Sequence, residues 1–229
     1  EYAQSSVVTL GFEPATEDGS IIVERKGNLW YDVYFYGQKA HAGRDHHKVT
    51  NACGELALKF AQAQALTDYS KNITVNIGKI TGGDKYNVIS DKAYGQLDVR
   101  FPCFKTRNFV KNQLDELFSN PELSSKQGDN SSDISFEVVD DCPPLPKSLP
   151  SCKLAESYLR SIEQFEKNTV SMVGAGGAAD SNYFCRDDSS VVLDGLGAVG
   201  GGMHTHQEYL EIDSLATRSM ALLNLLKNI

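Results

Sequence analysis

The chain has 229 residues, with a hydrophobic share of 41% and a charged share of 23%, which are ordinary values for a globular protein of one large or two small domains. Its net charge of −8 argues against nucleic acids and anionic membrane surfaces as partners. No apolar run reaches the ~18–20 residues that a membrane span needs.

The five cysteines are widely spaced and contain no Cys-x-x-Cys pair, which disfavours a disulfide framework or a structural zinc finger. Reduced thiols in a cytoplasm-like compartment are the simplest interpretation, although Cys142 and Cys152 are close enough in sequence to leave a disulfide open. These thiols favour the cytoplasm. The chain begins at Glu1 without an initiator methionine and looks internal, so the absence of a signal-peptide pattern leaves the compartment open.

Before the first long strand, the apolar run at 6–12 predicts a short buried strand. Apolar periodicity then predicts strand, helix, strand, strand, helix and strand across residues 26–141. This order is the split βαβ, ferredoxin-like pattern, in which helices cover one face of an antiparallel sheet. We expect a hairpin turn at Gly82-Gly83-Asp84, an irregularity near Gly95 and a loop at 124–133. The six elements are expected at 28–37, 46–66, 73–80, 88–101, 107–119 and 134–139.

After the proline cluster that begins at Pro143, helices and short apolar strands alternate as in an α/β layer with buried strands. The sequence therefore predicts an α/β domain (1–25 and 142–229) interrupted by an inserted α+β domain (26–141). The later elements are expected at 154–165, 169–173, 180–186, 190–193 and 213–227.

Six short patterns follow one another along the chain. They are Gly11-Phe12-Glu13-Pro14, Gly37-Gln38-Lys39-Ala40-His41-Ala42-Gly43, Gly82-Gly83-Asp84-Lys85-Tyr86-Asn87, Asp98-Val99-Arg100, Gly176-Gly177-Ala178-Ala179-Asp180 and Gly202-Met203-His204. In this order they resemble the co-catalytic zinc metallopeptidase and amidohydrolase family of glutamate carboxypeptidases, acetylornithine deacetylases, succinyl-diaminopimelate desuccinylases and aminoacylases. The Phe-Glu-Pro form is most similar to the glutamate carboxypeptidase branch.

This resemblance implies a zinc-dependent hydrolase of amide or peptide bonds. Glu13 matches a carboxylate ligand of one zinc ion, and His204 matches an imidazole ligand of the other. His41 matches the catalytic histidine that stabilises the oxyanion, often from the other protomer of a homodimer formed through the inserted lid domain. For His41 and the two metal positions, the alternative is an ordinary surface side chain.

The resemblance also implies a small-molecule or peptide substrate with a free carboxylate. Arg100 and Asn87 match residues that hold this carboxylate, a role that suits the planar fork of arginine. Gly176 and Gly177 match a loop that lines the substrate, although Ala179 replaces the hydroxyl residue usual in that turn. A salt bridge within the sheet is the alternative for Arg100.

Most of the metal cage of such an enzyme is missing from this sequence. The family has a His-x-Asp pair, a bridging aspartate and a Glu-Glu pair before the Phe-Glu-Pro strand, and the chain contains neither motif pair. We therefore expect the C-terminal part of a metallopeptidase, inactive by itself and a weak binder of the two zinc ions of the complete enzyme. The alternatives are a non-catalytic dimerisation or binding module, or an unrelated enzyme with a serine or cysteine nucleophile.

Overall fold

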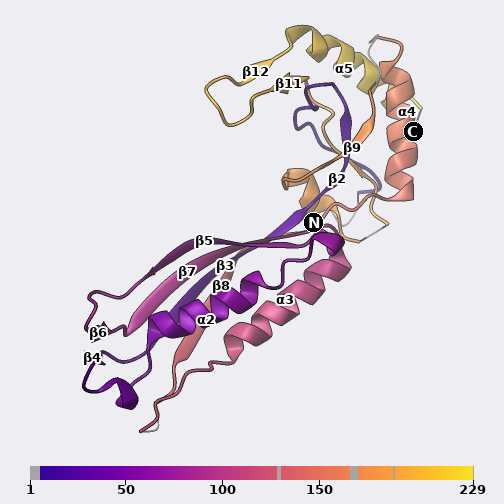
Figure 1. Cartoon of the computed structure of the whole chain (residues 1–229). Helices are drawn as coiled ribbons and strands as arrows, with labels where there is room; N and C mark the ends of the chain where they lie inside the picture. Colours follow the sequence, from indigo (N-terminus) through magenta and orange to yellow (C-terminus); the bar gives the residue numbers. More distant parts are fainter. Residues whose placement is uncertain (1–5, 128–129, 166–169, 188, 229) are drawn as a thin grey trace. The chain divides into compact units, whose positions relative to one another are not determined.

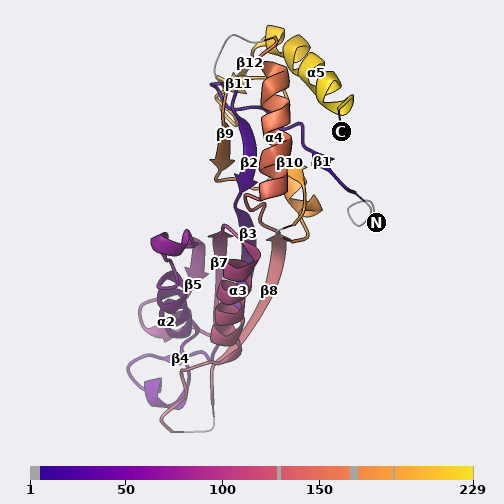
Figure 2. The same cartoon turned by 90° about the vertical axis from the view of Figure 1, so that its right-hand side faces the viewer.

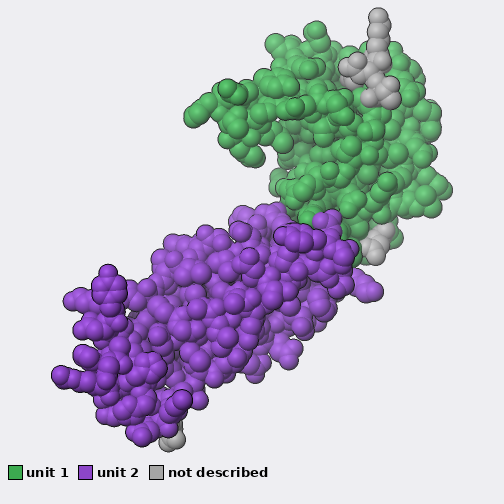
Figure 3. Space-filling model, in the orientation of Figure 1, with its two compact units in different colours: residues 1–27, 102–104, 142–229 green, residues 28–101, 105–141 purple. Residues whose placement is uncertain are grey.

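The computed structural model describes residues 6–127, 130–165, 170–187 and 189–228. The chain divides into two compact units, which Figure 3 shows in different colours. Unit 1 comprises Glu1–Gly27, Pro102–Phe104 and Cys142–Ile229, and unit 2 comprises Asn28–Phe101 and Lys105–Asp141.

Unit 2 is built on a four-stranded sheet in the order β5-β7-β3-β8, with helices α2 and α3 on one of its faces (Figures 1 and 2). Counted along the chain, the strand order is 2-3-1-4, so the predicted ferredoxin-like arrangement is confirmed. The elements are β3 (Gly27–Tyr36), α2 (Ala52–Gln64), β5 (Thr74–Gly82), β7 (Lys92–Phe101), α3 (Phe104–Ser119) and β8 (Asp133–Cys142), with a short 3₁₀ turn η2 (Tyr69–Lys71).

The alternation of side chains in β3 explains why this sheet has one covered face and one open face. Leu29, Tyr31, Val33 and Phe35 are fully buried and join a single apolar cluster with side chains of α2 and α3. Between them, Trp30 points to the other face and remains 45% exposed. Burying each large apolar side chain stabilises the unit by roughly 1.5–3 kcal/mol.

Two predicted elements of unit 2 are wrong in their extent. The helix expected at 46–66 is a 3₁₀ turn, η1 (His46–Lys48), followed by α2, because the Asn51 side chain accepts the Cys53 amide at 3.1 Å and starts a new helix there. The loop around 124–133 shortens because β8 begins at Asp133.

The single strand expected at 88–101 is interrupted. Its first part, β6 (Val88–Ile89), pairs with β4 (Ala40–His41) in a separate two-stranded sheet, and only β7 pairs with β5. Gly82 to Asp84 therefore begin a longer connection instead of a tight hairpin turn. The irregularity expected near Gly95 lies in the partner strand, where the register shifts between Ile77 and Lys79.

Unit 1 contains the short parallel pairs β1–β10 and β2–β9, with α4 and α5 packed on a second apolar cluster. The α4 helix begins earlier than the predicted 154 because Ser148 accepts the Ser151 amide and Pro150 suits the first helical turn. The elements are β1 (Thr9–Leu10), β2 (Ile21–Arg25), α4 (Leu149–Ile162), β9 (Met172–Ala175), the 3₁₀ turn η3 (Asp180–Phe184), β10 (Val192–Leu193), β11 (Gly200–Gly201), β12 (Tyr209–Leu210) and α5 (Ile212–Leu226).

Strand β2 was not expected from the sequence. Ile21, Ile22 and Val23 are all buried, as in the interior of a parallel sheet, so they lack the alternation that marks a half-buried strand. The strand expected at 6–12 shortens to β1, and the one expected at 169–173 is β9, with Thr169 outside the described residues.

None of the five cysteines, all of which lie in the described part of the chain, forms a disulfide, so the alternative of a Cys142–Cys152 bond is not realised. Among the described residues, no helix is both long and apolar enough to cross a bilayer.

Candidate functional site

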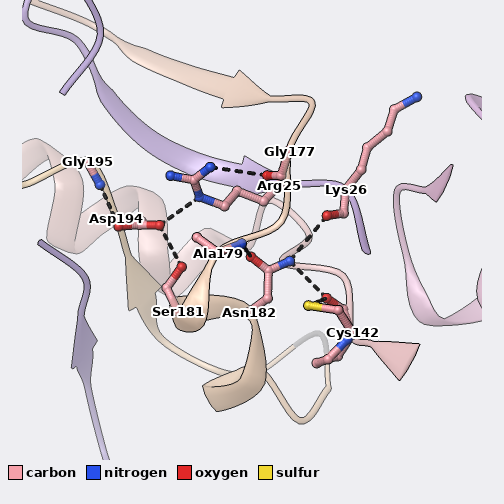
Figure 4. A network of polar contacts seen from close by, with 10 residues as sticks. Arg25, Lys26, Cys142, Gly177, Ala179, Ser181, Asn182, Asp194 and Gly195 are labelled. Carbon is pink, nitrogen blue, oxygen red and sulfur yellow. Dashed lines mark hydrogen bonds and ion pairs between the residues drawn. The ribbon is translucent and has the colours of Figure 1, made fainter. Parts of the chain in front are cut away.

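A buried ion pair organises the centre of unit 1 (Figure 4). The Asp194 side chain is fully buried, and its Oδ2 accepts Arg25 Nε and Ser181 Oγ, each at 2.6 Å. Its Oδ1 accepts the Gly195 amide at 2.7 Å. A side chain at Gly11 would place Cβ 2.4 Å from the same Oδ1, so only glycine fits there. Asp194 therefore has three donors and joins β2, η3 and the turn that begins at Gly195.

The same network holds the loop after β9, which was predicted to line the substrate. Arg25 donates from Nη1 to the Gly177 carbonyl at 3.1 Å (Figure 4). A side chain built at Gly176 or Gly177 would meet no atom within 4 Å, so this loop borders open space. The predicted role of these two glycines stays a prediction, but their backbone is anchored by a buried arginine.

Asn182 connects this loop to two of the segments at which the chain passes between the units, those at Gly27 and Cys142. It is fully buried in η3, and its Oδ1 accepts the Ala179 amide at 3.1 Å. Its Nδ2 donates to the Lys26 carbonyl at 3.3 Å and to the Pro143 carbonyl at 2.8 Å. One amide side chain thus joins the entering segment, the leaving segment and the loop (Figure 4).

The two predicted metal ligands both lie in unit 1. Glu13 follows β1, its side chain is exposed, and its carbonyl accepts the Gly197 amide at 3.0 Å. Seven residues beyond Gly197, His204 is exposed in the turn between β11 and β12. Its φ of +64° is in the left-handed region, which is uncommon for a residue other than glycine and costs roughly 1 kcal/mol or more.

These two residues do not form a metal site by themselves. Among the described residues, no cluster of three or more His, Cys, Asp or Glu side chains is arranged to hold a metal ion. A zinc site in a protein normally has three or four protein ligands. The donors present in the described part of this chain therefore do not fit a complete zinc site.

In unit 2, the pairing of β4 with β6 brings the predicted catalytic histidine close to Asn87. His41 pairs with Val88, and the Ala42 amide donates to the Asn87 carbonyl at 2.9 Å. The imidazole is exposed, and its Nδ1 accepts the Gly43 amide at 3.2 Å, a contact that does not use Nε2. A hydrogen bond from Lys48 lowers the pKa of nearby Asp45, and the charges of His47 and His41 add to this effect.

Arg100 lies at the other end of unit 2, so Asn87 and Arg100 do not share one carboxylate site within a chain. Arg100 is the penultimate residue of β7, eight residues after Lys92. The β4–β6 pair, which contains His41 and directly follows Asn87, lies past the Lys92 end of that strand (Figure 1). At about 3.3 Å per residue, the separation is roughly 26 Å or more. The structure brings His41 together with Asn87 and separates both from Arg100.

Sequence reasoning missed Arg25 and Asn182, and it included Asp98 only as part of the Asp98-Val99-Arg100 pattern. The polar partners of these residues are distant in sequence: Arg25 and Asp194 are 169 residues apart. A signal was present for Arg25, since a charged residue only two positions after the apolar run Ile21-Ile22-Val23 needs a partner if it is buried.

Comparison with known proteins gives a family match for part of the chain. Residues 23–126 match the model of the peptidase dimerisation domain. Among curated proteins, carboxypeptidase G2 of Pseudomonas sp. strain RS-16 is 22% identical over 220 residues, which are 95% of this chain and 51% of that protein. The [LysW]-lysine/[LysW]-ornithine hydrolase of Saccharolobus solfataricus is 22% identical over 85% of this chain and 51% of its own length.

A shorter match is a p-aminobenzoyl-glutamate hydrolase homolog of Haemophilus influenzae, 26% identical over 61% of this chain and 31% of that protein. This chain spans about half the length of the first two relatives.

Solved structures share the fold. Aminopeptidase PepT of Bacillus cereus superimposes with a TM-score of 0.77 at 19% identity, over 98% of this chain and 60% of that one. A tripeptidase of Staphylococcus aureus gives a TM-score of 0.70 at 18% identity, over 98% of this chain and 57% of that one.

Proposed function

Since residues 23–126 of this chain match the peptidase dimerisation domain and the whole chain shares the fold of peptidase structures, we propose that it is the C-terminal part of a zinc-dependent, glutamate-carboxypeptidase-like metallopeptidase. The reaction is hydrolysis of an amide or peptide bond in a substrate with a free carboxylate. Residues 1–25 and 142–229 belong to the catalytic domain, and 26–141 form the lid and dimerisation domain.

The placement of the predicted residues at the two ends of unit 2 is the observation that carries this proposal. His41 and Asn87 are roughly 26 Å or more from Arg100 in one chain, so they cannot act on one small substrate with it. A homodimer resolves this, because His41 and Asn87 of one copy then complete the site to which the other copy contributes Arg100. His41 would stabilise the oxyanion that forms during hydrolysis, and the names of the peptidase and hydrolase relatives support this class of reaction.

The metal part of the proposal depends on groups that this chain does not supply. Glu13 and His204 each provide one donor, and the described residues contain no complete metal cluster. Further ligands and the general base must come from another part of the protein. Zinc in the complete enzyme would supply a Lewis acid and an activated water.

A metal and activity assay of two polypeptides tests the proposal. The present chain should keep no zinc after dialysis against a weak chelator and should not hydrolyse N-acyl-glutamate substrates. The full-length protein should retain two zinc ions and hydrolyse them. In the full-length protein, His204→Ala should lose zinc and activity, whereas His46→Ala, an exposed histidine of unit 2, should lose neither.

Two outcomes would overturn the proposal. If the present chain holds about two zinc ions tightly, the missing ligands have been misassigned. If the full-length protein is a dimer without metal or activity, the alternative of a non-catalytic dimerisation module is correct.

A further inference from the structure

A chain of three polar side chains crosses the open face of the unit 2 sheet. Trp30 donates from its indole Nε1 to Asp98 Oδ1 at 3.1 Å. Asp98 in turn accepts Arg100 Nε, with Oδ1 at 2.8 Å and Oδ2 at 3.1 Å. The indole therefore orients the carboxylate, and the carboxylate orients the guanidinium.

The sheet geometry places all three groups on one face. Asp98 and Arg100 are two residues apart on β7, so their side chains point to the same side, and β3, which carries Trp30, is the strand next to β7. The side chains of Asp98 and Arg100 are 34% and 26% exposed, respectively. Trp30 and Asp98 border a cavity of about 320 Å³ on this face, so the groups adjoin open space.

The contact leaves the binding edge of Arg100 free. Asp98 occupies only Nε, and among the described residues neither Nη group of Arg100 has a hydrogen-bond partner. The N–H groups on Nη1 and Nη2 form the fork that binds a carboxylate in bidentate fashion. Arginine has many rotamers, and fixing its side chain beforehand lowers the entropy that a ligand must remove on binding.

We infer that Asp98 and Trp30 are positioning residues that hold the Arg100 fork ready for the substrate carboxylate. This inference rests on the proposed function, because it assigns Arg100 to carboxylate binding. Trp30 acts only through Asp98, and Asp98 only through Arg100. Both residues set affinity for the carboxylate end of the substrate and take no part in bond cleavage.

A salt bridge that merely stabilises the sheet makes a different prediction. In that case Trp30 contributes packing area, and replacing its indole with another aromatic ring leaves ligand binding unchanged. Trp30→Phe distinguishes the two roles, because it removes the N–H donor but keeps every charge and most of the apolar surface. Asp98→Asn is the second variant, since it keeps the shape and one acceptor but loses the negative charge.

The first measurement establishes the contact in the present chain. Trp30 is the only tryptophan of the chain, so the single indole N–H resonance in an NMR spectrum reports this site directly. Asp98→Asn and Arg100→Met should both shift that resonance. Gln96→Leu is the matched control, because Gln96 lies on the same face and donates to Asp32 at 3.0 Å, a hydrogen bond separate from those that join Trp30, Asp98 and Arg100. An indole resonance that neither of the first two variants moves would overturn the inference.

The second measurement uses the full-length protein and compares KM with kcat. Loss of one hydrogen bond that orders the fork should raise KM for an N-acyl-glutamate substrate roughly 3- to 10-fold in Trp30→Phe, with a smaller change in kcat. KM for the corresponding substrate with a carboxamide in place of the carboxylate should not change, and Gln96→Leu should alter neither value. An unchanged KM for the carboxylate substrate in Trp30→Phe would overturn the inference.

The two proposals fail in distinguishable ways. If the full-length protein hydrolyses no amide, the proposed function fails, and calorimetric titration with N-acetyl-L-glutamate then decides the positioning role. Binding that weakens several-fold in Trp30→Phe supports it. Equal affinity in wild type and Trp30→Phe, or no binding to either, refutes it.

Discussion

Removing Arg25 should destabilise unit 1 strongly, because it leaves a buried carboxylate without its cation. The side chains of Arg25 and Asp194 are 9% and 0% exposed, and Nε lies 2.6 Å from Oδ2. The substitution Arg25→Met keeps the length of the apolar stem and removes the charge. Breaking a buried ion pair on one side costs about 3–5 kcal/mol.

The structure refines this magnitude in two opposing ways. Asp194 keeps two donors, Ser181 Oγ at 2.6 Å and the Gly195 amide at 2.7 Å, which reduces the penalty. The variant also loses the bond from Arg25 to the Gly177 carbonyl, worth roughly 0.5–1.5 kcal/mol. We therefore expect a loss of about 3–4 kcal/mol in the free energy of unfolding of unit 1.

Urea unfolding, monitored both by hydrogen exchange and by tryptophan fluorescence, measures this loss separately in each unit. Trp30 belongs to unit 2, so its fluorescence transition should not move, whereas peptides from β2, β9 and β10 should lose protection. Lys48→Met is the control, since its ion pair with Asp45 is exposed and should contribute about 0–1 kcal/mol.

A double variant tests whether the unpaired buried charge of Asp194 causes the loss of stability. Arg25→Met combined with Asp194→Asn removes the unpaired buried charge, so it should be more stable than Arg25→Met alone. A single variant that loses less than about 1 kcal/mol, or a double variant that loses the sum of the two single effects, would show that desolvation of Asp194 is not the dominant cost.

Two other predictions concern unit 2 and its contrast with unit 1. Hydrogen bonds from Lys59 and Gln62 lower the pKa of Glu122 below its ordinary value of 4.5, so this contact stabilises the fold above that pH and is lost as the pH falls through the folded-state pKa. The urea midpoint of unfolding should therefore fall less steeply with decreasing pH in Glu122→Gln than in wild type. Parallel curves of midpoint against pH would contradict this. In a dilute solution of the present chain, backbone amides of unit 2 should exchange more slowly than those of unit 1. Several strands of unit 1 are only two residues long, and the groove of about 380 Å³ beside Phe12 and Leu215 leaves apolar surface open. Equal hydrogen-exchange protection in the two units would contradict this prediction.

The unit 2 fold was predictable because its information is local. In β3, alternate residues from Leu29 to Phe35 face the helices, and this period of two is visible in the sequence alone. Helix ends were less predictable: α2 begins at Ala52 and not at His46, since a cap at Asn51 competes with the apolar periodicity. Strand β2 was missed because burial on both faces erases the alternation.

The sequence by itself supplied the candidate site residues, because short patterns such as Gly202-Met203-His204 and Asp98-Val99-Arg100 are continuous along the chain, and the roles of these residues stay predictions. It also determined that the metal ligands are incomplete. Only the tertiary structure decided that His41 and Arg100 lie at opposite ends of unit 2. It alone paired Trp30 with Asp98 across 68 residues, and Arg25 with Asp194 across 169. Such pairs leave no periodic signal, because a polar side chain finds its partner only after the strands that carry both have been brought together by packing.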